Sequence, residues 1–210
     1  MRNKIFLGIA AAALMASSPA ISATVDFTNG TNGANGFFED PTFAVGNGVT
    51  VTVSAGTYLA DTIVDTDVDG FLDLVVSKTN AGLGVALDLL PVFPDLNGPL
   101  DLLTFAFSSA VSLNSLTFGN VDANDDFDIF FDGVLAANDV GISGANPALF
   151  GGVELTEFSV GADQVSLFFG SDDFTVAGFD VSIAAVPLPA GLPLLLAGLG
   201  GMIAVRRKRR

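Results

Sequence analysis

Two acidic clusters hold the residue types most able to do chemistry in this chain of 210 residues. In the first cluster carboxylates recur at alternate positions, Gly70 allows a sharp turn, and a further Asp follows. Oxygen ligands two residues apart on a turning backbone point towards one ion, which is the spacing of a calcium-binding loop. The spacing therefore predicts a calcium site made of Asp65, Asp67, Asp69 and Asp73.

The first cluster departs from the EF-hand pattern in one position. At position twelve of the loop Val76 stands where a Glu would bind in a bidentate manner, and no helical period flanks the segment. The segment is more similar to the DxDxDG calcium loops of extracellular repeats, with one ligand missing. A solvated acidic turn between two strands is an equally good interpretation of the same residues.

The second cluster has oxygen-bearing side chains at alternate positions but Phe127 where a turn Gly would stand. This composition favours a hairpin loop over a metal site. Its members are Asp122, Asn124, Asp125, Asp126 and Asp128.

The absence of two residue types limits the chemistry further. The chain has neither Cys nor His, which removes Ser-His and Cys-His nucleophile pairs, the usual zinc ligands and the usual general base. A pair of carboxylates remains able to hydrolyse glycosidic bonds. We therefore expect a non-enzymatic protein and keep a carboxylate glycosidase as an alternative.

Charge separates the ends of the chain from its middle. Lys78 is the only basic residue in residues 24–185, whereas all twenty-three acidic residues lie there. Such a segment cannot neutralise phosphates, which excludes nucleic acid as a partner.

Apolar residues alternate with polar or small ones over short runs in the same segment. The clearest runs are Val49/Val51/Val53, Leu103/Phe105/Phe107, Phe127/Ile129/Phe131, Val165/Leu167/Phe169 and Phe179/Val181/Ile183. A period of two predicts short antiparallel strands, and a change of phase near Asn114 predicts a bulge or bend. We therefore expect an all-β fold, a jelly-roll-like antiparallel β-sandwich with a core built from the nineteen Phe residues.

The start of the chain has the layout of a secretory signal peptide. Two basic residues precede an apolar run over residues 5–15, and small residues follow. The run is shorter than the ~20 residues that cross a bilayer, so it predicts export rather than an anchor. Cleavage is expected after Ala23, and Ala20 is the second choice because Ser18 and Ala20 are both small.

The end of the chain has three parts: Val186, Pro187, Leu188, Pro189 and Ala190, then an apolar stretch to Val205, then five basic residues. The apolar stretch predicts a short membrane-spanning helix with its basic end in the cytoplasm, and the prolines keep the approach extended. The whole resembles the VPLPA variant of the PEP-CTERM sorting signal. This resemblance implies transient anchoring in the inner membrane and cleavage by a membrane-embedded exosortase. A single-pass anchor that is never cut is the alternative.

These features predict a signal peptide at residues 1–23, a secreted β-sandwich domain at 24–185 and a sorting signal at 186–210. We expect a structural or adhesive protein of the cell surface or extracellular matrix, with an exosortase-type enzyme and extracellular polysaccharide as partners. A calcium-assisted carbohydrate-binding module is the alternative function, and the carboxylate glycosidase is the third.

Overall fold

The structure is a computed structural model, and it describes residues 20–59, 62–65, 74–87, 101–162 and 174–184. Every regular element within these residues is a β-strand, so the predicted all-β class is confirmed. The strands are β1 (Ile21–Asp26), β2 (Gly36–Phe38), β3 (Thr42–Gly46), β4 (Val49–Leu59), β5 (Thr62–Asp65), β6 (Leu74–Lys78), β7 (Leu83–Leu87), β8 (Asp101–Gly119), β9 (Asp126–Phe131), β10 (Val134–Gly141), β11 (Ala148–Gly161) and β12 (Thr175–Ile183).

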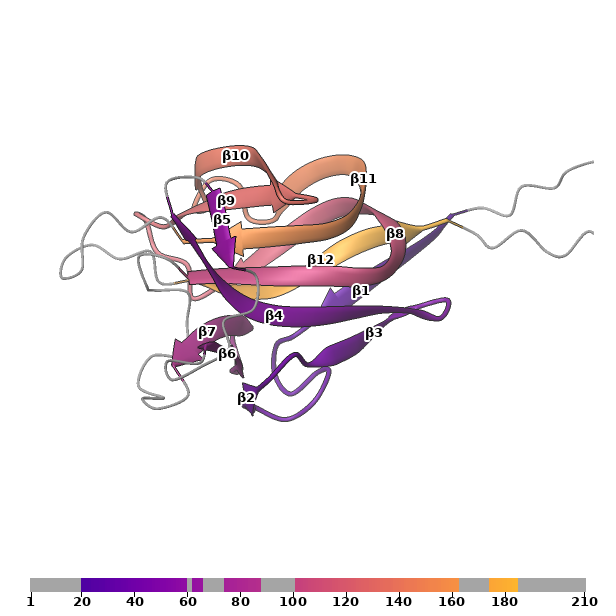
Figure 1. The fold of residues 1–210 in the computed structure, drawn as a ribbon, viewed down its shortest axis with the longest axis horizontal. Coiled ribbons are helices and arrows are strands. Elements are labelled where there is room, and N and C mark those ends of the chain that lie inside the picture. The colour runs from indigo at the N-terminus through magenta and orange to yellow at the C-terminus, as the bar shows by residue number, and fades with distance from the viewer. Residues whose placement is uncertain (1–19, 60–61, 66–73, 88–100, 163–173, 185–210) are drawn as a thin grey trace, which may run out of the picture. The chain divides into compact units, whose positions relative to one another are not determined.

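The twelve strands form one antiparallel sheet that folds over on itself. Residues 101–107 of β8 pair with β4, and residues 112–119 of the same strand pair with β12. The exposed residues 108–110 separate these two halves, and β11 accompanies β8 along both of them. The sheet therefore bends along β8 and β11, and its two halves face each other as layers (Figure 1).

The described runs all lie in strands, and their named apolar residues are buried except for the half-buried Phe131. Burial does not alternate throughout, because Thr104 of β8 and Asp128 and Phe130 of β9 are buried between them. The run that begins at Val165 lies outside the described residues. The predicted change of phase is confirmed, because β12 pairs Val181 with Leu113 but pairs Asp180 with Ser115. Asn114 is thus the extra residue of a bulge. The buried apolar positions are odd-numbered before it (Val111, Leu113) and even-numbered after it (Leu116, Phe118).

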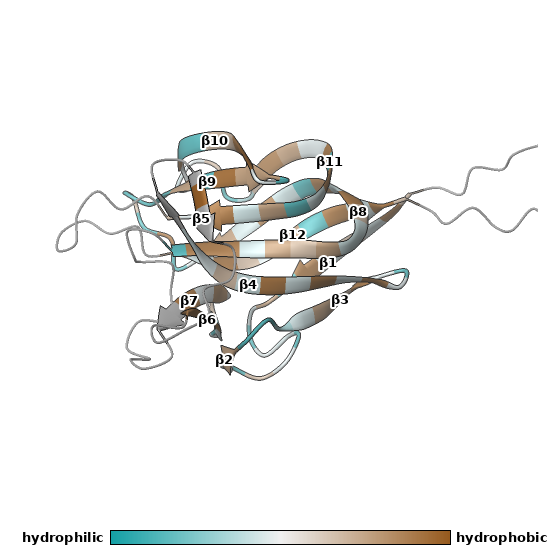
Figure 2. Ribbon diagram, viewed as in Figure 1, coloured by the Kyte–Doolittle hydropathy of each residue, from teal (hydrophilic) through white to brown (hydrophobic). Residues whose placement is uncertain are grey.

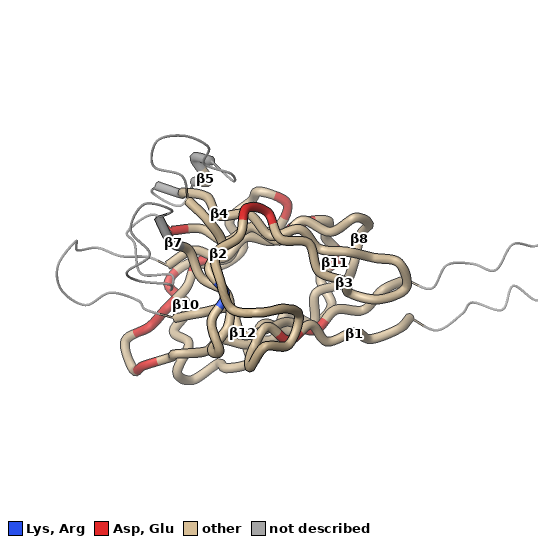
Figure 3. The backbone as a smooth tube through the Cα atoms, turned by 90° about the horizontal axis from the view of Figure 1, so that it is seen from below, with Lys and Arg blue, Asp and Glu red and all other residues tan. Residues whose placement is uncertain are grey.

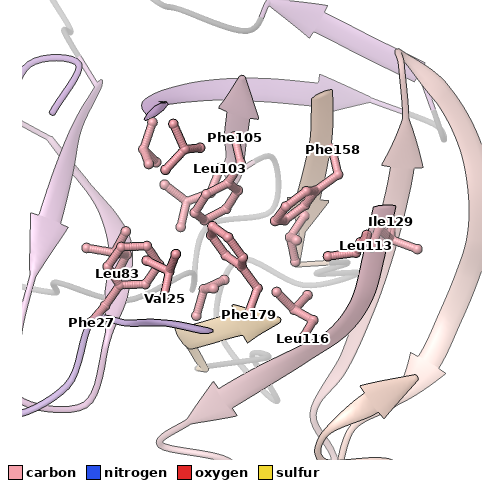
Figure 4. Packing of buried hydrophobic residues seen from close by; sticks show 14 of the residues in the cluster. Val25, Phe27, Leu83, Leu103, Phe105, Leu113, Leu116, Ile129, Phe158 and Phe179 are labelled. Carbon is pink, nitrogen blue, oxygen red and sulfur yellow. The ribbon is translucent and has the colours of Figure 1, made fainter. Parts of the chain in front are cut away.

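Phenylalanine fills much of the space between the layers, as the composition predicted. Seven of the eleven largest fully buried side chains are Phe. The ring centroid of Phe105 in β8 lies 4.6 Å from that of Phe158 in β11 and 5.8 Å from that of Phe179 in β12 (Figure 4). Phe27 contacts both Phe105 and Phe179. These rings bury large apolar areas without a polar group to satisfy, so they stabilise a domain that has no disulfide.

Two hairpins use the tight-turn sequences that the chain contains. Asn47-Gly48 joins β3 to β4 with φ values of 49° and 77°, and Asp132-Gly133 joins β9 to β10 with 47° and 77°. Positive φ at both positions is typical of a type I′ turn. The β3–β4 tip is hydrophilic beside strands that carry hydrophobic residues (Figure 2).

The compact unit Ile21–Ala184 begins and ends in neighbouring strands. Its first strand, β1, pairs with its last strand, β12, over the whole length of β1, and Ile21 lies opposite Ile183. The entry and the exit of the chain into this unit are therefore side by side.

Candidate functional site

The predicted calcium residues lie mostly outside the described residues. Asp67, Asp69 and Asp73 belong to the segment 66–73. Asp65 is the last residue of β5, where it pairs with Thr57 of β4. The calcium site at these four residues stays a prediction.

The sorting motif at residues 186–190 and the predicted membrane helix after it also lie outside the described residues. The described part of the chain ends at Ala184, directly after β12. Within that part, no helix has the length and apolar character needed to cross a membrane.

The second acidic cluster spans the connection from β8 to β9 and the start of β9, which contains Asp126 and Asp128. Three of its carboxylates accept hydrogen bonds from backbone N–H groups. Asp122 Oδ1 accepts a hydrogen bond from the N–H of Asn124 at 3.0 Å, and Asp125 Oδ2 accepts one from the N–H of Asp122 at 2.6 Å. Asp128 is fully buried, and its Oδ1 accepts from the N–H of Asp139 at 2.9 Å. Each carboxylate supplies an acceptor for a backbone N–H in irregular structure.

The Asp128 contact supports an irregularity in β10. The register of β10 against β9 shifts between Ala137 and Val140, and Asp139 has a φ of 51°. Extra residues in a strand lose regular ladder partners. The carboxylate of Asp128 provides that partner from inside the domain, which explains why this acidic residue is buried.

The sequence predicted a hairpin loop at this cluster, which would make β8 and β9 paired neighbours. This prediction is wrong, because β11 lies between these two strands in the sheet. Asp122, Asn124 and Asp125 lie in a loop, whereas Asp126 and Asp128 lie in β9. In addition, β9 pairs with β10 and β11 and does not pair with β8. Turn residues mark where a strand ends, and they do not specify which strand becomes its neighbour. Within the described ranges, no group of three or more acidic residues is placed to hold a metal ion.

Lys78 is a residue that the sequence analysis singled out only as the one basic residue of an acidic segment. The structure shows that it is also buried. Its side chain is 3% exposed at the end of β6, and its Nζ has no hydrogen-bond partner among the described residues. Burial lowers the pKa of Lys78, and the negative charge of Asp26 opposes this shift. Lys78 is the only Lys or Arg among the described residues, and Figure 3 marks its place on the backbone in blue. Its side chain is held where the charged form is disfavoured.

Asp26 supplies that opposing charge while its carboxylate stabilises a turn. Asp26 Oδ1 accepts hydrogen bonds from the hydroxyl of Thr28 at 2.7 Å and from its N–H at 2.8 Å. Asn32 Nδ2 donates to the Asp26 carbonyl oxygen at 2.7 Å. The bonds from Thr28 lower the pKa of Asp26, because they stabilise the ionised carboxylate.

Glu157 in β11 is a carboxyl group whose pKa is raised. Burial is the main cause, and the negative charge of Asp132 adds to it. Asp132 Oδ1 accepts hydrogen bonds from the N–H and hydroxyl of Thr156 and from the N–H of Glu157, at 2.9 to 3.0 Å. These bonds join the β9–β10 turn to β11, which gives Asp132 a structural role.

Two aromatic residues of the described domain are exposed to solvent. Phe37 and Phe38 lie in β2, a strand that pairs only with β6, and they are 46% and 37% exposed. Exposed rings on an edge strand offer an apolar surface to a partner.

Comparisons of the chain with protein-family models, with curated proteins and with solved structures found no match.

Proposed function

We propose that this chain is an exported, non-catalytic protein of the cell surface or extracellular matrix, with a structural or adhesive role. In this proposal a signal peptide directs export, and the central domain is a jelly-roll-like β-sandwich. Residues 186–210 anchor the chain transiently in the inner membrane until an exosortase-type enzyme cuts it. The single observation that carries the proposal is the motif Val186, Pro187, Leu188, Pro189 and Ala190, followed by an apolar stretch and five basic residues.

Properties of the described domain support this function. Its Phe core needs no disulfide, and its excess of acidic residues favours solubility outside the cell. The exposed rings of Phe37 and Phe38 provide an apolar surface for adhesion. Because Ile21 lies beside Ile183, one attachment point after β12 leaves the rest of the domain accessible.

The direct test is mass spectrometry of the mature C-terminus, on protein recovered from surface and culture fractions. We expect a chain that lacks the apolar stretch and the basic residues of 186–210. Recovery of a chain that is intact through Arg210 would contradict sorting and leave an uncut membrane anchor.

The motif itself is tested by the double variant Pro187→Ala/Pro189→Ala. Alanine lets the segment continue into a helix, whereas proline keeps it extended, so we expect export to continue and the cut to be lost. The matched control is Pro94→Ala/Pro99→Ala, which removes two prolines outside the motif and should be cut normally. Equal cutting of both variants would show that the prolines of the motif are not recognised.

A further inference from the structure

The register of β1 bears on where the precursor is processed at its N-terminus. All six residues of β1 pair with β12, from Ile21 opposite Ile183 to Asp26 opposite Gly178. Residues 21–23 therefore supply half of this strand. Cleavage after Ala23, the position that the sequence favours, would remove them.

The first half of β1 also contributes to the interior of the domain. Ala23 packs against the core, and its pairing partner Val181 is fully buried. A Cβ atom placed on Gly46 of β3 would lie 3.7 Å from Ile183 Cδ1 and 3.9 Å from Ala23 Cβ. Ala23 and Ile183 thus fill the space beneath β3 together.

Loss of residues 21–23 would have two physical consequences. The backbone of residues 181–183 would lose its partner on the β1 side, and water would gain access to Val181 and Ile183, which are buried. Burial of apolar side chains stabilises the folded state, so partial exposure of both would destabilise the end of β12. That end lies directly before the sorting motif in the sequence.

We infer that the precursor is cut between Ala20 and Ile21, so that the mature protein keeps the whole of β1. This inference rests on the proposed export of the chain. A signal peptidase would add water across that peptide bond, leaving a carboxyl group on Ala20 and an amino group on Ile21. Ser18 and Ala20 provide the small residues that such an enzyme requires on the leaving side, and Ala20 is exposed just before β1.

The test determines the mature N-terminus of the exported full-length protein by intact mass and N-terminal sequencing, for the wild type and for Ala20→Val and Ala23→Val. Valine is too bulky for the position before the cut. We expect the wild type and Ala23→Val to begin at Ile21, and Ala20→Val to lose that terminus. A wild type that begins at Thr24 would overturn the inference while leaving export intact.

A precursor that keeps Met1 in the cell fraction would overturn the inference and the proposed export together. A second measurement examines the strand itself, with a precursor that lacks residues 21–23 and so places Ala20 directly before Thr24. We expect its exported product to melt at a lower temperature than the wild-type product. Equal melting temperatures would contradict the role of residues 21–23 in the fold.

Discussion

The domain buries ionisable side chains in two regions, and in one of them these side chains accept hydrogen bonds from backbone N–H groups. Asp125, at the end of the β8–β9 connection, and Asp128, in β9, are almost fully buried, and one carboxylate oxygen of each accepts a hydrogen bond from a backbone N–H group. At the end of β6, Lys78 is equally buried, and its Nζ has no acceptor among the described residues. Turns and bulges provide free N–H donors for a carboxylate, whereas an ammonium group needs acceptor oxygens within reach, and the Nζ of Lys78 has none among the described residues. Buried carboxylates should therefore stabilise this domain and the buried amine should not.

The largest effect is expected at the carboxylate of Asp128, whose Oδ1 accepts the N–H of Asp139. Asp128→Ala leaves the N–H of Asp139 without its acceptor inside the domain, and such a loss costs about 1–3 kcal/mol. The free energy of unfolding, measured by denaturant titration, should fall by that amount. Asp128→Asn keeps an acceptor oxygen, so the free energy of unfolding should fall less in this variant than in Asp128→Ala.

The control for Asp128 is Glu154→Ala, which removes an exposed carboxylate from β11. A surface substitution of this kind changes stability by less than about 0.5 kcal/mol. If Asp128→Asn destabilised the domain as much as Asp128→Ala, the negative charge and not the acceptor would be the stabilising property.

The opposite sign is expected at Lys78. Lys78→Met keeps the length of the side chain and removes an amine without a partner, so the domain should become more stable by about 1 kcal/mol at neutral pH. Thermal and denaturant unfolding measure this gain. Unchanged or lower stability would mean that the amine makes a favourable contact with a part of the chain outside the described residues.

The pH dependence of this gain follows from the lowered pKa. Between the lowered folded value and the ordinary 10.5, the unfolded chain binds more protons than the folded domain. The stability of the wild type therefore rises with pH through that window, and its deficit relative to Lys78→Met should shrink. Ser77→Ala is the matched control, because it removes a buried hydroxyl without a partner and has no such pH dependence.

The sequence predicted the strands well because burial on alternate positions is a local property. The run ending in Phe107 and the bulge at Asn114 could both be located in this way. The pairing of strands could not, because β9 lies beside β11 rather than beside β8, its predecessor in the chain. Non-local pairing depends on how the whole sheet folds over, which no short pattern contains.

The buried charges illustrate the same limit. The acidic composition of residues 122–128 indicated a loop, which is confirmed for residues 122–125, whereas residues 126–128 begin β9. The inward position of Asp128 follows from its contact with Asp139 across two strands. The lack of a partner at Lys78 likewise depends on elements distant in sequence, including β2, which pairs with β6.

A smaller effect on stability is expected at Glu157, because this carboxyl group is only half-buried, whereas Asp128 and Lys78 are buried. Its pKa is raised in the folded domain, so folding is penalised once the pH rises above the ordinary 4.5 and through the folded value. Glu157→Gln should be more stable than the wild type at pH 7 by a few tenths of a kcal/mol, after screening by solvent. The two proteins should be equally stable near pH 3.

The contribution of Asp132 to this shift can be separated by NMR titration of Glu157. Asp132→Asn keeps an oxygen that accepts from Thr156 while removing the negative charge. The pKa of Glu157 should therefore fall towards its ordinary value in this variant. An unchanged pKa would assign the whole shift to burial.

The smallest effect is expected from calcium at the β8–β9 connection. The carboxylates of Asp122 and Asp125 already accept backbone N–H groups, and the described residues contain no metal-binding group of three acidic side chains. Asp122→Asn/Asp126→Asn should therefore leave the response of the melting temperature to calcium unchanged. A response lost in this variant would show that the connection rearranges to hold the ion.

The matched variant is Asp67→Asn/Asp69→Asn, which removes two ligands of the predicted calcium loop. If that loop binds calcium only in the folded state, calcium at a hundred times its dissociation constant stabilises the wild type by about 2.7 kcal/mol. General screening also stabilises an acidic domain, so calcium, magnesium and sodium must be compared at equal ionic strength. A calcium-specific rise that Asp67→Asn/Asp69→Asn abolishes, and Asp122→Asn/Asp126→Asn retains, would assign the ion to the first acidic cluster. Equal rises in all three proteins would identify both clusters as turns, because screening acts on the net charge of the domain and not on one set of ligands.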